Sequence, residues 1–276
     1  MLTRIIAGLV GLPILVFFVI SGDLILLAAI GLVALIGLWE LYRAFCPRLL
    51  WVHWVGFGLA AGYFVRLAFW SIEDFGWSVL AMIMIMPILT MLPVVLMGKK
   101  RDIINPMVVV FGHLYIVVSL SSIYFLRVNF GSVYEVWLIF IAAWGCDTGA
   151  YFVGKAIGKR KLAPILSPKK TVAGAVGGTV VATLLGAAYG FILWNFDIVD
   201  MGEIGLFAAV TFACSLAAQL GDLAASAIKR ERGVKDFGRL IPGHGGVLDR
   251  FDSIIFAAPT AFIIFWVIRS FSEVVP

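Results

Sequence analysis

Residues 24–42, LILLAAIGLVALIGLWELY, form an apolar run long enough to cross a bilayer as a helix. Similar runs recur along the whole chain, separated by polar residues or by glycine and proline. They fall at 3–22, 24–42, 52–71, 77–97, 104–126, 133–153, 172–195, 203–228 and 253–272. Their length, and the lack of short alternating segments, argue against β-strands. The sequence therefore predicts an all-α polytopic integral membrane protein with about nine transmembrane helices.

The composition excludes several other classes of protein. Of the 276 residues, 62% are hydrophobic and 13% are charged, too few charges to coat a soluble domain. Disorder, a coiled coil and a soluble enzyme with one anchor are excluded because apolar residues recur throughout. The net charge of +5 does not indicate a nucleic-acid partner, since the basic residues flank apolar runs. The scattered cysteines indicate neither disulfides nor a zinc site.

The charges between the apolar runs predict the orientation in the membrane. Basic residues gather in one alternate set of loops, at Arg4, Arg43, Arg48, 99–101, 155–170 and 229–250. The opposite set is mostly acidic. By the positive-inside rule, the N-terminus is cytoplasmic and the C-terminus extracytoplasmic. The compact chain without a targeting extension favours a bacterial cytoplasmic (inner) membrane, with the active site facing the cytoplasm.

Polar residues divide the chain into two regions. Residues 1–126, with about five helices, show little chemistry. Residues 127–276, with about four helices, form the predicted catalytic region. It carries polar clusters at 145–155, 167–171 and 222–252, all expected at the cytoplasmic face. The topology should therefore bring these clusters together.

Two aspartates lie inside apolar runs. Asp147 and Asp222 are there at a cost of about 2.5–3.5 kcal/mol each if they sit at a helix centre. They either have a partner or lie near the hydrated interface. Asp222, Ser226 and Lys229 follow an i, i+4, i+7 pattern, which places acid, hydroxyl and base on one helical face.

The segment before the last apolar run combines carboxylates with a glycine-rich turn. Asp249 and Asp252 are three residues apart at the start of a predicted helix, and glycines surround His244. Carboxylate oxygens suit Mg²⁺, and glycines permit close backbone approach to phosphate. Alone, these features would mean a helix cap and a turn. With the surrounding cations they predict a nucleoside triphosphate site, with Asp222 and Asp249 as the principal Mg²⁺ ligands and Asp252 and Asp147 as weaker candidates.

The same segment resembles a known family. SAIKR at 226–230, KD at 235–236 and PGHGGVLDRFD at 242–252 resemble the signature of phosphatidate cytidylyltransferases, also called CDP-diacylglycerol synthases. DTGAY at 147–151, GK at 158–159 and SPKKT at 167–171 resemble the family's upstream segments. The resemblance covers about residues 144–252. Ala173 departs from it, because the family usually has an acidic residue there, which puts any role of that acid in doubt.

The resemblance implies that CTP and phosphatidic acid give CDP-diacylglycerol and pyrophosphate in phospholipid biosynthesis, with Mg²⁺ required and a second cation left open. The lipid phosphate is itself a nucleophile, so the protein needs to position it and to neutralise charge. The expected catalytic residues are Asp222, Asp249, Lys229 and His244. Those expected to bind CTP or the lipid phosphate are Ser167, Lys169, Lys170, Thr171, Ser226, Arg230, Lys235, Gly243, Gly245, Gly246 and Arg250.

Two other functions remain open at this point. A CTP- or ATP-dependent lipid-alcohol (polyprenol) kinase would need a base, which Asp147 or His244 could provide. An ion-coupled transporter could use the intramembrane acids to bind cations, but it would not need the cationic glycine-rich loop. The expected partners are CTP, phosphatidic acid and the lipid bilayer, and a homo-oligomer is left open.

Overall fold

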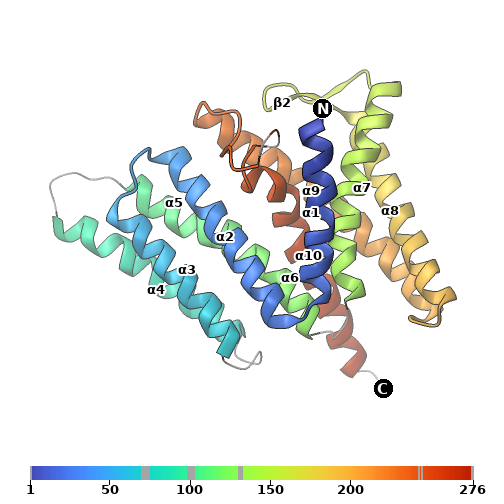
Figure 1. Ribbon diagram of the computed structural model, residues 1–276, viewed down its shortest axis with the longest axis horizontal. Coiled ribbons are helices and arrows are strands. Elements are labelled where there is room, and N and C mark those ends of the chain that lie inside the picture. The colour runs from blue at the N-terminus through green and yellow to red at the C-terminus, as the bar shows by residue number, and fades with distance from the viewer. Residues whose placement is uncertain are drawn as a thin grey trace. The chain divides into compact units, whose positions relative to one another are not determined.

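The computed structural model describes residues 2–69, 75–97, 103–129, 133–241, 243 and 245–274, and these are almost entirely helical (Figure 1). In chain order the elements are α1 (Leu2–Ile20), α2 (Asp23–Phe45), α3 (Trp51–Phe69), α4 (Phe75–Met97), α5 (Ile104–Gly112), the π-helical segment η2 (His113–Val118), α6 (Ser119–Asn129), α7 (Tyr134–Ile157), β1 (Lys161–Ala163), β2 (Ser167–Thr171), α8 (Val172–Asn195), α9 (Met201–Glu231) and α10 (Leu248–Val274).

Within the described residues, each predicted apolar run corresponds to a helix, and α5, η2 and α6 together form the fifth. In the described part of the chain, eight helical spans are long and apolar enough to cross a membrane, and α1 adds a shorter apolar stretch at Gly11–Ile20. Large apolar side chains are exposed on most of these helices, as expected for surfaces that face lipid. The predicted all-α polytopic fold is confirmed, and the protein is an integral membrane protein.

The chain folds as two compact units. The first unit contains the residues up to Tyr124 together with Arg232–Arg250. The second contains Phe125–Glu231 together with the residues from Phe251 onward. The segment with most of the glycine-rich signature therefore belongs to the first unit, whereas the helices before and after it belong mainly to the second.

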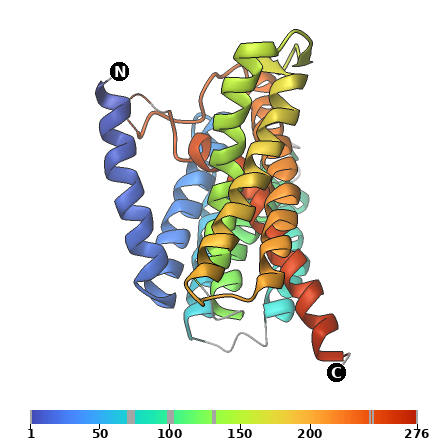
Figure 2. The ribbon, with the colours of Figure 1, turned by 90° about the vertical axis from the view of Figure 1, so that its right-hand side faces the viewer.

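Helices α7, α8 and α9 of the second unit run side by side (Figures 1 and 2). Glycines let α7 and α8 approach closely, as is common between membrane helices. A Cβ atom at Gly178 of α8 would lie 2.5 Å from the carbonyl oxygen of Cys146 and 3.0 Å from the Cβ of Ala150. On α7, a Cβ at Gly149 would lie 2.7 Å from the Cβ of Val181. The two helices thus meet through backbone as much as through side chains.

We expect Gly178→Ala to destabilise the protein by roughly 1–3 kcal/mol, because the added methyl group overpacks the contact between α7 and α8. Gly205→Ala is the matched control, since Gly205 is also helical and a Cβ there would have no heavy atom within 4 Å. Thermal unfolding of the two variants in detergent measures the difference. Equal stability would contradict the close approach of the helices.

A short hairpin connects α7 to α8 and was not anticipated from the sequence. Strands β1 and β2 are antiparallel, with Lys161 opposite Thr171 and Ala163 opposite Ser167. Thr171 ends β2 and caps α8, since its Oγ1 accepts a hydrogen bond from the Gly174 N–H at 3.1 Å. The hairpin therefore holds the SPKKT segment extended at the N-terminus of α8.

Candidate active site

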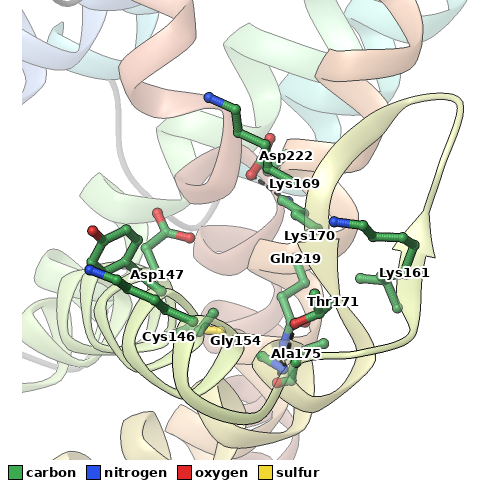
Figure 3. Close-up of a pocket in the computed structure, with 16 residues that line it drawn as sticks. Cys146, Asp147, Gly154, Lys161, Lys169, Lys170, Thr171, Ala175, Gln219 and Asp222 are labelled. Carbon is green, nitrogen blue, oxygen red and sulfur yellow. Dashed lines mark hydrogen bonds and ion pairs between the residues drawn. The ribbon is translucent and has the colours of Figure 1, made fainter.

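A pocket of about 480 Å³ opens in the second unit, beside the β1–β2 hairpin (Figure 3). Helices α7, α8 and α9 and the hairpin supply its walls. It is lined by Cys146, Asp147, Ala150, Tyr151, Gly154, Lys155, Gly158, Lys161, Leu162, Lys169, Lys170, Thr171, Gly174, Ala175, Gln219 and Asp222. The first two predicted polar clusters and the start of the third thus contribute to one pocket.

The predicted polar face of Asp222, Ser226 and Lys229 lies on α9, and its first two members are in contact. Asp222 forms an ion pair with Lys170 of β2, and each side chain is about a quarter exposed. The hydroxyl of Ser226 donates a hydrogen bond to Oδ1 of Asp222 at 3.4 Å. Lys229, the third member, has its Nζ 3.9 Å from Oδ2 of Asp252 on α10. Asp222 therefore has the cationic partner that its position in an apolar helix requires.

Three carboxylates of the second unit share one region. Asp147 is exposed on α7 and lines the pocket, on the opposite side from Lys161 of the hairpin (Figure 3). Asp252 lies near enough to both Asp222 and Asp147 to interact with them electrostatically. Like charges so placed repel each other unless cations compensate them. Lys170 beside Asp222 and Lys229 beside Asp252 compensate part of this negative charge.

Several residues of the pocket were not among the predicted site residues. Lys155, Lys161 and Gln219 line the pocket, and Gln219 donates a hydrogen bond from Nε2 to Oγ1 of Thr179 at 2.9 Å. A signal for Lys155 was present, because it follows Asp147 by eight residues on the same helix and so shares its face. Gln219 precedes Asp222 by three residues, which is also a same-face spacing. Lys161 reaches the pocket through the hairpin, which no pattern in the sequence predicted.

The predicted phosphate-binding residues divide between the two units. Lys169, Lys170 and Thr171 line the pocket, although the Thr171 hydroxyl also caps α8. Ser167, Ser226 and Arg230 lie in the second unit, and Lys235, Gly243, Gly245, Gly246 and Arg250 lie in the first. The predicted catalytic residue His244 lies outside the described residues.

The carboxylate of Asp249 holds the turn of the first unit together. It is buried, and its Oδ2 accepts hydrogen bonds from the N–H groups of Phe237, at 2.8 Å, and Gly246, at 2.9 Å. Gly243 and Gly245 have φ values of 77° and 85°, which favour glycine. The predicted glycine-rich turn is thus present. The role of Asp249 as a Mg²⁺ ligand stays a prediction.

The donor set of the second unit fits a magnesium ion that arrives with a triphosphate. Among the described residues, no three His, Cys, Asp or Glu side chains are grouped so as to hold a metal ion. Mg²⁺ commonly needs only one or two carboxylates, with waters and phosphate oxygens completing the shell. Asp222 and Asp147 are hard oxygen donors on the wall of one pocket that also carries lysines.

Comparison with known proteins agrees with this chemistry. The sequence model of the cytidylyltransferase family matches residues 2–268, and the chain therefore belongs to that family. The family assignment predicted from the signature is thereby confirmed.

The chain is also similar to three curated bacterial phosphatidate cytidylyltransferases. The Bacillus subtilis protein is 45% identical over 139 residues, which cover 49% of this chain and 50% of the relative. The Staphylococcus saprophyticus protein is 42% identical over 148 residues, 51% of this chain and 55% of the relative. The Staphylococcus haemolyticus protein is 40% identical over 142 residues, 51% of this chain and 53% of the relative. Each match spans about half the length of the relative.

Proposed function

We propose that the protein is a membrane-embedded nucleotidyltransferase that converts CTP and phosphatidic acid to CDP-diacylglycerol and pyrophosphate. The observation that carries the proposal is the pocket of the second unit, in which lysines of the hairpin face carboxylates of α7 and α9. Such a site suits a polyanionic nucleotide. The names of the similar bacterial proteins support phosphatidate as the second substrate.

For this reaction the protein must position the two substrates and neutralise the negative charge of their phosphates. An oxygen of the lipid phosphate attacks the α-phosphorus of CTP and forms the new P–O bond. The bond from the α-phosphorus to the oxygen bridging to the β-phosphorus breaks, and pyrophosphate leaves with that oxygen. Lys155, Lys161 and Lys169 line the pocket and can bind the phosphates that carry this charge. A protein nucleophile is not required.

We also propose that Mg²⁺ is the cofactor. Asp222 and Asp147, with Asp252 nearby, would hold it, and Asp249 is the further ligand predicted from the sequence. When bound, the ion would neutralise negative charge on the reacting phosphates. Asp222 is a suitable ligand because its carboxylate lines the pocket and lies near a second carboxylate, that of Asp252.

The assay that tests the function combines purified protein, labelled CTP, Mg²⁺ and phosphatidic acid. A CMP-linked lipid and pyrophosphate are expected. Formation of CDP with a phosphorylated lipid alcohol, when a polyprenol is supplied, would instead identify a kinase. Absence of both products with a folded protein would contradict the proposal and favour a transporter.

The site is proposed to face the cytoplasm of a bacterium whose inner membrane holds the protein. The support is the positive-inside distribution of charge, because the lysines of the pocket belong to the basic set of loops. Cytoplasmic CTP would then reach the site directly.

A reporter fused after residue 276 is therefore expected to signal from outside the cytoplasm. A phosphatase active only outside and a fluorescent protein active only inside form a complementary pair of reporters. Fluorescence from the C-terminal fusion would contradict the orientation and place the lysines of the pocket on the wrong side for CTP.

A further inference from the structure

Glu40 of α2 is a fully buried carboxylate in a region where the sequence indicated little chemistry. Its Oε1 accepts a hydrogen bond from the Val247 N–H at 3.0 Å, and its Oε2 accepts one from the Leu248 N–H at 2.7 Å. Leu248 begins α10, so both bonds satisfy amide groups at a helix N-terminus. The positive end of the helix dipole favours an anion there. Glu40 thus caps the start of α10 at Leu248, a residue of the same unit as Glu40.

Two glycines of the signature segment make room for this carboxylate. A Cβ atom at Gly238 or at Gly246 would collide with Oε1 of Glu40, and the three nearest atoms at each position all belong to Glu40. Neither glycine has a positive φ. They are therefore needed for space and not for an unusual backbone conformation.

The same end of α2 also holds the start of the segment. Arg232 donates hydrogen bonds from Nε to the carbonyl oxygen of Ala44 and from Nη2 to that of Phe45, both at 3.3 Å. Its guanidinium lies over the Phe45 ring, 4.7 Å from the ring centroid. These carbonyls belong to the last turn of α2, which favours a cation. The segment from Arg232 to Leu248 is thus fastened to α2 at both ends.

We infer that Glu40 is a positioning residue for the glycine-rich turn and for Asp249, which follows Leu248 directly. Asp249 accepts hydrogen bonds from Phe237 and Gly246 of the turn, while Glu40 holds the two residues just before Asp249. Glu40 therefore acts through the backbone of the turn. The inference rests on the proposed function, in which Asp249 serves the reaction.

Glu40→Gln and Glu40→Ala test the inference. Both variants should lower kcat, by roughly 10- to 100-fold for alanine, and raise the Mg²⁺ concentration for half-maximal activity. Glutamine should be milder, because its amide oxygen can still accept one hydrogen bond. A residue that served stability alone would reduce only the yield of folded protein. Wild-type kcat and Mg²⁺ dependence in the folded fraction would overturn the inference.

The Gly238→Ala variant is a second, independent test of the inference, because the added methyl group should displace the Glu40 carboxylate. It should lower kcat in the wild-type background and have little further effect once Glu40 is alanine. Gly58→Ala on α3 is the control, since a Cβ there would have no heavy atom within 4 Å. Losses that multiply in the double variant would show that Gly238 acts independently of Glu40 and would overturn the inference.

The results of these experiments distinguish a failure of this inference from a failure of the proposed function. If the wild-type protein forms no CDP-diacylglycerol, the proposed function fails. The pair of Gly238→Ala and Glu40→Ala can then still be compared by thermal unfolding, where Gly238→Ala should destabilise only the chain that retains Glu40. If the wild-type protein is active and the Glu40 variants match it, the inference fails and the function stands.

Discussion

Asp222→Asn is expected to reduce nucleotidyl transfer at least about 100-fold while the protein remains folded and inserted. Asparagine keeps the shape of the side chain and can still accept the hydrogen bond from Ser226, but it loses the charge that pairs with Lys170. The same charge is the one proposed to bind Mg²⁺. The measurement is kcat with labelled CTP and phosphatidic acid over a range of Mg²⁺ concentrations.

Asp200→Asn is the matched control for this experiment. Asp200 is an exposed aspartate just before the start of α9, whereas Asp222 lies in the second half of α9. Its replacement should leave kcat unchanged. Near-normal activity and Mg²⁺ dependence in a folded Asp222→Asn protein would show that the pocket is not the metal site.

Lys170→Gln is expected to have the second-largest effect, with kcat/KM for CTP reduced at least about tenfold. Lys170 lines the pocket and is the partner of Asp222, so its loss removes a cation that phosphates can bind and leaves the carboxylate uncompensated. Lys169→Gln should have a smaller effect, because Lys169 is more exposed. Steady-state kinetics with varied CTP measure both.

Lys100→Gln is the reference for the lysine series, because Lys100 belongs by sequence to a different basic loop. If all three variants show equal and small effects, the lysines of the hairpin serve only to orient the chain in the membrane. A larger effect confined to Lys170 would support its role at the site.

The transmembrane helices could be predicted because a bilayer demands long uninterrupted apolar segments. The residues at which these helices begin and end could not be predicted. Helix α10 begins at Leu248, before the apolar run that starts at 253, and α9 continues through Glu231. Polar residues such as Asp249 and Arg230 lie in these extensions and interrupt the apolar pattern, so hydropathy gives no signal for the helix ends. The hairpin is short and polar, so nothing in its composition distinguishes it from a loop.

In the candidate site, too, some residues could be predicted from the sequence and others could not. Asp147 and Asp222 stood out because charge within an apolar run is costly and needs a reason. Lys170 was predicted from the polar SPKKT segment and its resemblance to the family. Glu40 stands in an apolar run as well, but its partners are backbone N–H groups 207 and 208 residues further along the chain. Backbone groups carry no sequence signal. Only the fold shows that this glutamate and the glycines around it belong together.

The glycine contact between α7 and α8 affects how tightly the pocket can bind a ligand. Where backbone meets backbone, as at Gly178 and Cys146, there are no long side chains whose rotamers could freeze or rearrange when a ligand arrives. The main chain of these two helices is thus preorganised beside the pocket, so that on binding conformational entropy is lost mainly by lining side chains such as Tyr151 and Lys155. A rigid wall also adapts poorly to a ligand of the wrong size. Selectivity for one head group would then come from the shape of the main chain.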